Sequence, residues 1–178
     1  REQDVECRYA PAPAGDRTVV GLAMGPYDRG RPLVIDPEIL WGSYLGGTST
    51  DMPHAIAVDA TGNVYITGDT YSTNFPSTAG FDRTFGEPVD AFVTKVNASG
   101  MTLAWSSFLG GSSADYGYGI DVDALGNVYV AGYTNSTDFD TTGGFDTTHE
   151  GNSEAFVTKF GATGTRLWSS YLGGASDE

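Results

Sequence analysis

The sequence predicts an all-β protein that contains two tandem copies of one supersecondary unit. Three observations lead to this fold class. The string Tyr44-Leu45-Gly46-Gly47 returns in nearly the same form at residues 108–111 and 171–174. Residues 44–100 align without gaps on residues 108–164, with 30 identities in 57 positions, which chance similarity does not produce. No segment carries a sustained apolar period of 3.6 residues, so little helix is expected.

Each unit is expected to form four short antiparallel strands. The turn Ala60-Thr61-Gly62-Asn63 joins the first two strands into a tight hairpin. A longer excursion at residues 70–89, rich in Ser, Thr, Pro and Gly, precedes the third strand, and the turn Asn97-Ala98-Ser99-Gly100 precedes the last. In the first unit, the strands are expected near residues 55–59, 64–68, 91–96 and 103–108.

A four-stranded antiparallel unit that repeats at a fixed period is typical of a β-propeller blade. The spacing of 64 residues exceeds the ~40–50 residues of a minimal blade, and the excursion at 70–89 with its twin at 134–153 accounts for the surplus. A β-solenoid or stacked sheet array is the alternative, but a solenoid coil repeats on ~20–30 residues. Because a propeller closes with ~4–8 blades, two blades make an incomplete propeller. Further blades are expected from the same polypeptide or from other copies, docked head to tail or by strand addition.

The repeat also predicts the domain organisation. Ile39–Leu45 resembles the last strand of a unit whose first three strands are missing. Pro11, Pro13 and Gly15 mark a turn in the segment before it, where strands are expected at residues 4–10, 17–24 and 32–36. The expected parts, in chain order, are an N-terminal β segment at 1–38 (the end of a preceding domain), an orphan outer strand at 39–47, blade 1 at 48–111, blade 2 at 112–174, and the start of a further repeat or a tail at 175–178.

Composition excludes several classes of function. Lys and Arg number 9 against 23 Asp and Glu, giving a formal net charge of −14. Nucleic-acid binding is therefore not expected, because phosphate-binding surfaces need clustered Lys and Arg. No apolar run approaches 18 residues, so no membrane span is expected. The single cysteine, Cys7, is expected as a free thiol or as a partner in a bond between chains.

Four repeated aspartates are the candidate metal ligands. Asp59 and Asp123 begin the Asp-x-x-Gly-Asn motifs, and Asp51 and Asp115 lie in the equivalent crossing loops. Their carboxylates could converge near the propeller axis and bind Ca²⁺, which takes oxygen ligands from loops. The alternative is that the first pair caps hairpin turns and that the second pair is surface charge. No other cofactor is predicted.

No catalytic set is visible in the sequence. No nucleophile, base and orienting residue stand in a recognisable pattern, and His54 and His149 occupy different repeat positions. Lys95 and Lys159, at one repeat position, are expected to extend to solvent and pair with carboxylates. One tryptophan recurs with the last strand of each unit, where it either packs between blades or stacks on a sugar; these are Trp41, Trp105 and Trp168.

Together, these motifs resemble the bacterial β-propeller repeat called SBBP. The resemblance rests on Tyr-Leu-Gly-Gly, Asp-x-x-Gly-Asn-Val-Tyr, the Ser-Thr-x-Phe stretches at 72–75 and 136–139, and Ala-Phe-Val-Thr-Lys, and it covers roughly residues 39–174. Residues 25–37 also look like the end of the β-rich domain that often precedes such repeats. The resemblance implies a large secreted or surface protein, often without known activity, and no catalytic residues.

The expected function is that of a non-enzymatic extracellular or cell-surface module, which acts as a scaffold, an adhesin or a self-assembling, filament-forming unit. The alternative is a ligand-binding or enzymatic propeller whose loops act on carbohydrate or bind Ca²⁺. The arrangement of polar residues separates the scaffold from the ligand-binding or enzymatic propeller, because an active site needs non-equivalent polar residues that meet at one point. The distinctive polar residues here are mostly repeated, which favours the scaffold.

Overall fold

The computed structural model describes residues 7–14, 17–24 and 41–174, and these form strands, turns and loops without any helix. The predicted all-β class is therefore confirmed for this part of the chain. It accordingly holds no helix of the length and apolarity that a membrane span requires. The chain divides into two compact units, Arg1–Ile39 and Leu40–Glu178.

In the first unit, β1 (Cys7–Ala14) and β2 (Arg17–Met24) form an antiparallel hairpin. β2 lies where it was predicted. The strand predicted at 4–10 is confirmed for its described residues 7–10, which lie in β1. The turn predicted at Pro11 and Pro13 was wrong, because both prolines lie inside the same strand. A two-stranded hairpin consists of two edge strands, and an edge strand tolerates a residue that lacks an N–H donor. The strand predicted at 32–36 and the segment at 25–37 lie outside the described residues.

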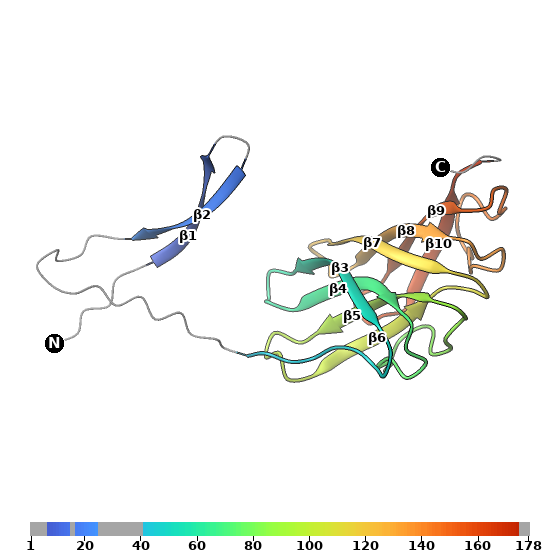
Figure 1. Ribbon diagram of the computed structural model, residues 1–178, viewed down its shortest axis with the longest axis horizontal. Coiled ribbons are helices and arrows are strands. Elements are labelled where there is room, and N and C mark those ends of the chain that lie inside the picture. Colours follow the sequence, from blue (N-terminus) through green and yellow to red (C-terminus); the bar gives the residue numbers. More distant parts are fainter. Residues whose placement is uncertain (1–6, 15–16, 25–40, 175–178) are drawn as a thin grey trace, which may run out of the picture. The chain divides into compact units, whose positions relative to one another are not determined.

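The second unit contains two four-stranded antiparallel sheets (Figure 1). We call the first strand of each sheet the inner strand and the last the outer strand. The predicted pair of blades is confirmed, and the inner strand of blade 1 begins four residues earlier than expected. Blade 1 consists of β3 (Asp51–Val58), β4 (Val64–Thr70), β5 (Asp90–Val96) and β6 (Leu103–Leu109), and blade 2 of β7 (Asp115–Val122), β8 (Val128–Thr134), β9 (Glu154–Phe160) and β10 (Arg166–Leu172).

The long excursion between β4 and β5 folds back over the outer strand of its own blade. Thr78 and Ser106 exchange main-chain hydrogen bonds of 3.0 and 2.8 Å. Phe75, which is 3% exposed, places its ring 4.5 Å from that of Phe92 and 6.2 Å from that of Phe108. The residues that lengthen this repeat beyond a minimal blade therefore build a second small core on one face of the sheet.

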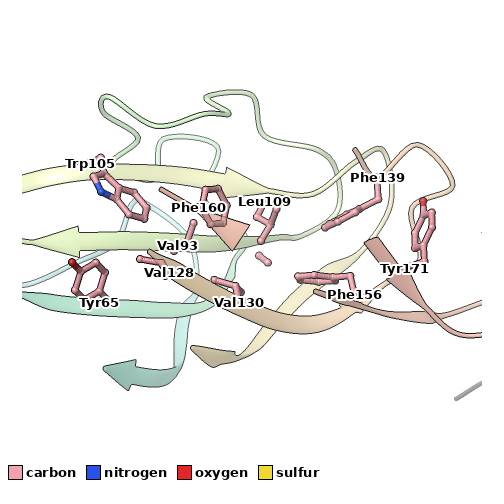
Figure 2. Packing of buried hydrophobic residues seen from close by; sticks show 11 residues of the cluster. Tyr65, Val93, Trp105, Leu109, Val128, Val130, Phe139, Phe156, Phe160 and Tyr171 are labelled. Carbon is pink, nitrogen blue, oxygen red and sulfur yellow. The ribbon is translucent and has the colours of Figure 1, made fainter. Parts of the chain in front are cut away.

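The main core lies between the two blades (Figure 2). Trp105 of β6 packs against Phe160 of β9, with ring centroids 5.9 Å apart. The guanidinium of Arg166 lies 4.6 Å from the ring centroid of Phe81, which comes from the excursion of blade 1. The inner strand β7 contacts β3, β4 and β5. This close approach uses Gly117, where a Cβ atom would lie 3.2 Å from the main-chain oxygen of Gly68.

Residues 41–47 form no strand, so the predicted orphan outer strand was wrong for the described part of its range. A strand needs a neighbour for its main-chain hydrogen bonds, and the structure describes none beside this segment. Its side chains still follow the repeat. The ring of Trp41 lies against Gly100, and Leu45 packs on the core cluster that contains Phe92.

Candidate functional site

Asp59 and Asp123 cap the hairpin that joins the first two strands of each blade. The carboxylate of Asp59 accepts hydrogen bonds from the main-chain N–H groups of Thr61 (2.9 Å) and Asn63 (3.0 Å) and from the hydroxyl of Tyr65 (3.0 Å). Asp123 accepts the corresponding bonds from its own hairpin. The side-chain amide of the asparagine at the end of each motif, Asn63 or Asn127, contributes most to lowering the pKa of these carboxyl groups. The donors that hold each carboxylate come from its own hairpin, from the turn and from the start of the second strand.

Asp51 and Asp115 close the crossing loops that lead into the inner strands. Oδ2 of Asp51 accepts a 2.7 Å hydrogen bond from the main-chain N–H of Gly47 and a 3.2 Å bond from the Ser72 hydroxyl. Oδ2 of Asp115 accepts equivalent bonds from Gly111 (2.8 Å) and Ser136 (2.9 Å). These aspartates therefore tie the Gly-Gly crossing to the end of the neighbouring strand.

The predicted convergence of the four aspartates was wrong. Asp51 begins β3 and Asp59 follows its last residue, so an eight-residue strand separates the two, and such a strand spans roughly 25 Å. β7 separates Asp115 from Asp123 in the same way. Among the described residues, no three His, Cys, Asp or Glu side chains gather as a metal cluster.

Asp115 instead lies beside Asp90, a residue that the sequence analysis did not select. Asp90 is the first residue of β5 and is 1% exposed, and Asp115 is 0% exposed. A Cβ atom at Gly110 would lie between the two side chains, 2.7 Å from Oδ2 of Asp115. Burial raises the pKa of Asp90 to about 8 and that of Asp115 to about 6. The sequence did contain a clue, because the acid before Ala-Phe-Val-Thr-Lys recurs in blade 2 as Glu154.

A second group of side chains, which we call the inner-strand cluster, joins the two blades where β3 and β7 begin. Nε2 of His54 is hydrogen-bonded to Oδ1 of Asp69, which is fully buried, and Oδ2 of Asp69 has no partner. The ring of His54 lies 4.9 Å from that of Tyr118. Tyr133 continues the stack, 5.6 Å from Tyr118 and 4.7 Å from Tyr116. Burial raises the pKa of Tyr133 to about 12.

Sequence reasoning missed the inner-strand cluster because it searched for repeated residues. His54 and Tyr118 occupy one repeat position, and Asp69 and Tyr133 occupy another. The two copies differ at both positions, and the fold brings all four side chains together. Departures from the repeat at structurally equivalent positions were the available signal.

The repeated lysines and tryptophans have roles within and between the blades. Nζ of Lys95 lies 5.1 Å from the ring centroid of Tyr65, and Lys159 lies 4.9 Å from that of Tyr129. These contacts are with aromatic faces, whereas carboxylate partners were expected. Trp105 is 2% exposed, and its Nε1 donates a 3.1 Å hydrogen bond to the main-chain oxygen of Ala162. Trp105 therefore packs between blades, as the first of the two alternatives predicted.

Comparisons with known proteins agree with this geometry. The family model described as "SBBP: Beta-propeller repeat" matches residues 40–76 and 104–140. Each match begins in the outer-strand position before a blade and continues through that blade's first two strands, including its crossing loop. No curated protein matches the chain. Both copies of the duplicated unit therefore contain a stretch that is similar to the SBBP beta-propeller repeat, in agreement with the resemblance that the sequence motifs gave.

Proposed function

We propose that this chain is a non-enzymatic structural module whose two free blade faces dock further blades of the same repeat. The proposal extends to an extracellular or cell-surface setting, in which the module is a scaffold, an adhesin or a filament-forming unit. A single observation carries it: the contact that joins blade 1 to blade 2 has an incomplete counterpart at each end of the pair.

The junction between blade 1 and blade 2 shows which contacts a docked blade makes. Trp105 lies on Gly164, where a Cβ atom would come 2.7 Å from the indole ring. Phe81 places its ring 6.2 Å from that of Phe160. Leu109, at the end of the same outer strand, is 2% exposed. A tryptophan, a phenylalanine and a leucine of one blade thus cover the face of the next.

At the N-terminal side, residues 41–45 occupy the place of a preceding outer strand. Trp41 lies on Gly100 as Trp105 lies on Gly164. Tyr44, however, is 104% exposed, while Phe108 at the corresponding position of blade 1 is 1% exposed. In blade 1, that side chain is covered by the excursion of its own sheet. The exposure of Tyr44 thus corresponds to a preceding blade that the described residues do not contain.

At the C-terminal side, no further blade covers the face of blade 2 among the described residues. Phe145 and Leu172 are 75% and 43% exposed, although Phe81 and Leu109 at the same repeat positions are 36% and 2% exposed. Trp168 and Phe145 line a shallow depression together with Gly143 and Gly144. Phe160 and Arg166 cover the equivalent Phe81 of blade 1. A further SBBP blade could therefore cover this surface with the same face that blade 2 packs against blade 1.

Sedimentation of the purified chain at increasing concentration tests docking between copies. We expect association above micromolar concentration that Phe145→Glu abolishes, because the new carboxylate would be buried against an apolar face. Leu125→Glu is the matched control, since Leu125 is 82% exposed at the tip of the hairpin between β7 and β8. A wild-type chain that stays monomeric throughout, or equal association of the two variants, would contradict the proposal.

The extracellular setting rests on composition and on what the SBBP resemblance implies. The chain has few lysines, many glycines and threonines, and a net charge of −14. Fractionation of the source cells with an antibody to the chain tests this part. Recovery in the culture medium or on the cell surface is expected, and recovery in the cytoplasm would contradict it.

The inner-strand cluster favours a second candidate, a carbohydrate-binding propeller. Non-equivalent residues meet there, and Tyr118, which is 49% exposed, lies against His54, the partner of the buried carboxyl of Asp69. Exposed aromatic faces next to a carboxylate suit the apolar faces and hydroxyls of a sugar. Calorimetric titration with a panel of oligosaccharides tests this candidate. Binding that is lost in Tyr118→Ala and kept in Tyr44→Ala would support it, and the absence of binding in the wild type would exclude sugars of that panel.

A further inference from the structure

The blade junction brings two carboxyl groups from different blades into one buried space. Asp90 begins β5 of blade 1, and Asp115 begins β7 of blade 2. The crossing segment between the blades passes these two carboxyl groups at Gly110. A Cβ atom added to Gly110 would collide with Oδ1 of Asp90 and Oδ2 of Asp115. Only glycine leaves that space open.

Two oxygens of this pair, Oδ1 of Asp90 and Oδ1 of Asp115, are buried without any hydrogen-bond partner. Oδ2 of Asp90 accepts a 2.8 Å hydrogen bond from the main-chain N–H of Gly86, but Oδ1 accepts none. Neither Asp90 nor Asp115 forms an ion pair with a Lys or Arg of the residues that the structure describes. A buried carboxylate oxygen without a donor is costly to leave uncompensated.

The surroundings of Oδ1 of Asp90 supply further oxygen atoms and, among the described residues, no cationic side chain. The main-chain oxygen of Gly111 lies close to Gly86, whose missing Cβ would also come 3.0 Å from Oδ1 of Asp90. Two carboxyl groups and one carbonyl therefore face the same space. Two like charges at this distance in a buried site require either a proton or a cation.

We propose that Asp90 and Asp115 bind a calcium ion at the blade junction, with the carbonyl of Gly111 as a third ligand. Calcium is favoured over magnesium, because its flexible coordination accepts oxygens from separate segments of the chain, whereas magnesium demands near-ideal octahedral geometry. The ion joins a ligand from each blade and so clamps the two sheets together. This site is independent of docking by further copies, since both blades of the junction belong to one chain.

Part of the arrangement around Asp90 recurs at the end of blade 2. Glu154 replaces Asp90 there, is 1% exposed, and has Oε2 without a partner. Gly173 packs beside it as Gly110 packs beside Asp90. The position that corresponds to Asp115 is Glu178, which lies outside the described residues. One calcium ion is therefore expected at the junction that the structure describes.

Thermal unfolding of the full chain with and without calcium tests the site. After treatment with a chelator at pH 8, added calcium should raise the Tm by several degrees at ~100-fold excess over its dissociation constant. Asp90→Asn, which keeps the shape of the side chain and removes its charge, should eliminate the shift. Asp121→Asn should keep it, because Asp121 is exposed and its carboxylate contacts only the N–H of the next residue.

A measurement on the wild type alone keeps the proposal falsifiable if the variant does not fold. Titration calorimetry of the chelator-treated wild type should show saturable binding of calcium at a single class of sites. No saturable binding, no calcium-dependent Tm shift in the wild type, or an unchanged shift in Asp90→Asn would overturn the proposal.

Discussion

The indole of Trp105 lies on the backbone of Gly164, so the outer strand of blade 1 is fixed on the last hairpin of blade 2. A Cβ atom at residue 164 would come 2.7 Å from both Cγ and Cδ2 of the indole, and the φ angle there is +83°. The contact therefore depends on glycine for its space and for its backbone conformation.

Gly164→Ala is expected to destabilise the protein by about 1–3 kcal/mol. The new methyl group would displace the indole, and an alanine at this position would have to adopt a positive φ that is unfavourable for it. Gly119→Ala is the matched control, since nothing lies within 4 Å of the Cβ position at Gly119. Urea unfolding followed by tryptophan fluorescence measures both free energies of unfolding. Equal losses in the two variants would contradict the close contact.

Trp105→Ala is expected to cost about 3–5 kcal/mol, as for other large core side chains. Trp168→Ala, at the same repeat position, should cost at most about 1 kcal/mol, because its junction lacks the next blade. Trp105 is 2% exposed and donates a hydrogen bond across the junction. Denaturant midpoints of the two variants, measured where the chain is monomeric, make the comparison. Similar losses would mean that Trp168 is packed within its own blade.

The free energy of unfolding is expected to decrease as the pH rises from about 4 to about 8 when calcium is absent. Burial raises the pKa of Asp90 to about 8 and that of Asp115 to about 6, against an unfolded value of about 3.9. Between these values the folded state holds protons that the unfolded state has lost, so folding is favoured at lower pH. Denaturant unfolding at pH 5 and pH 8 measures the change. Asp90→Asn should flatten the profile, and a slope that persists in this variant would assign it to other groups.

Asp59→Ala is expected to lower the Tm by a few degrees at pH 7, because it leaves several hydrogen-bond donors of the first hairpin without their acceptor. The hydrogen bonds that lower the pKa of Asp59 stabilise its charged form in the folded state. That contribution is present above the unfolded pKa and is lost as the pH falls below it. Calorimetric melts of the variant and the wild type should therefore converge towards pH 2. An equal difference at both pH values would exclude the charged carboxylate as the cause.

The repeat predicted the blades well because the information lies in local patterns. The hairpin at Asp59–Asn63 and the alternation in β4 and β5 specify strands and turns over a few residues. The Gly-Gly crossing and the recurring tryptophan then indicated how one blade passes to the next. Those features depend on neighbours in sequence or on one repeated contact.

The sites were harder to predict because they depend on which strand ends meet. Asp51 and Asp59 are near each other in sequence, yet an extended strand separates them. Asp90 and Asp115 are 25 residues apart and meet only because a blade crossing returns to the same edge. The turn predicted at Pro11 and Pro13 was wrong for a different reason: two prolines normally indicate a turn, but an edge strand accepts them.

Arg166 gives the junction a chemistry that the repeat does not share. Its guanidinium lies over Phe81 of the preceding blade and pairs with Asp140 of its own blade. Counting back 63 residues from the shared tryptophan, the corresponding position in blade 1 is Leu103. Blade 2 thus meets the outer face of blade 1 with a cation, whereas blade 1 carries an aliphatic side chain at the same position. The two copies therefore present different chemistry to a preceding blade at this position of the outer strand.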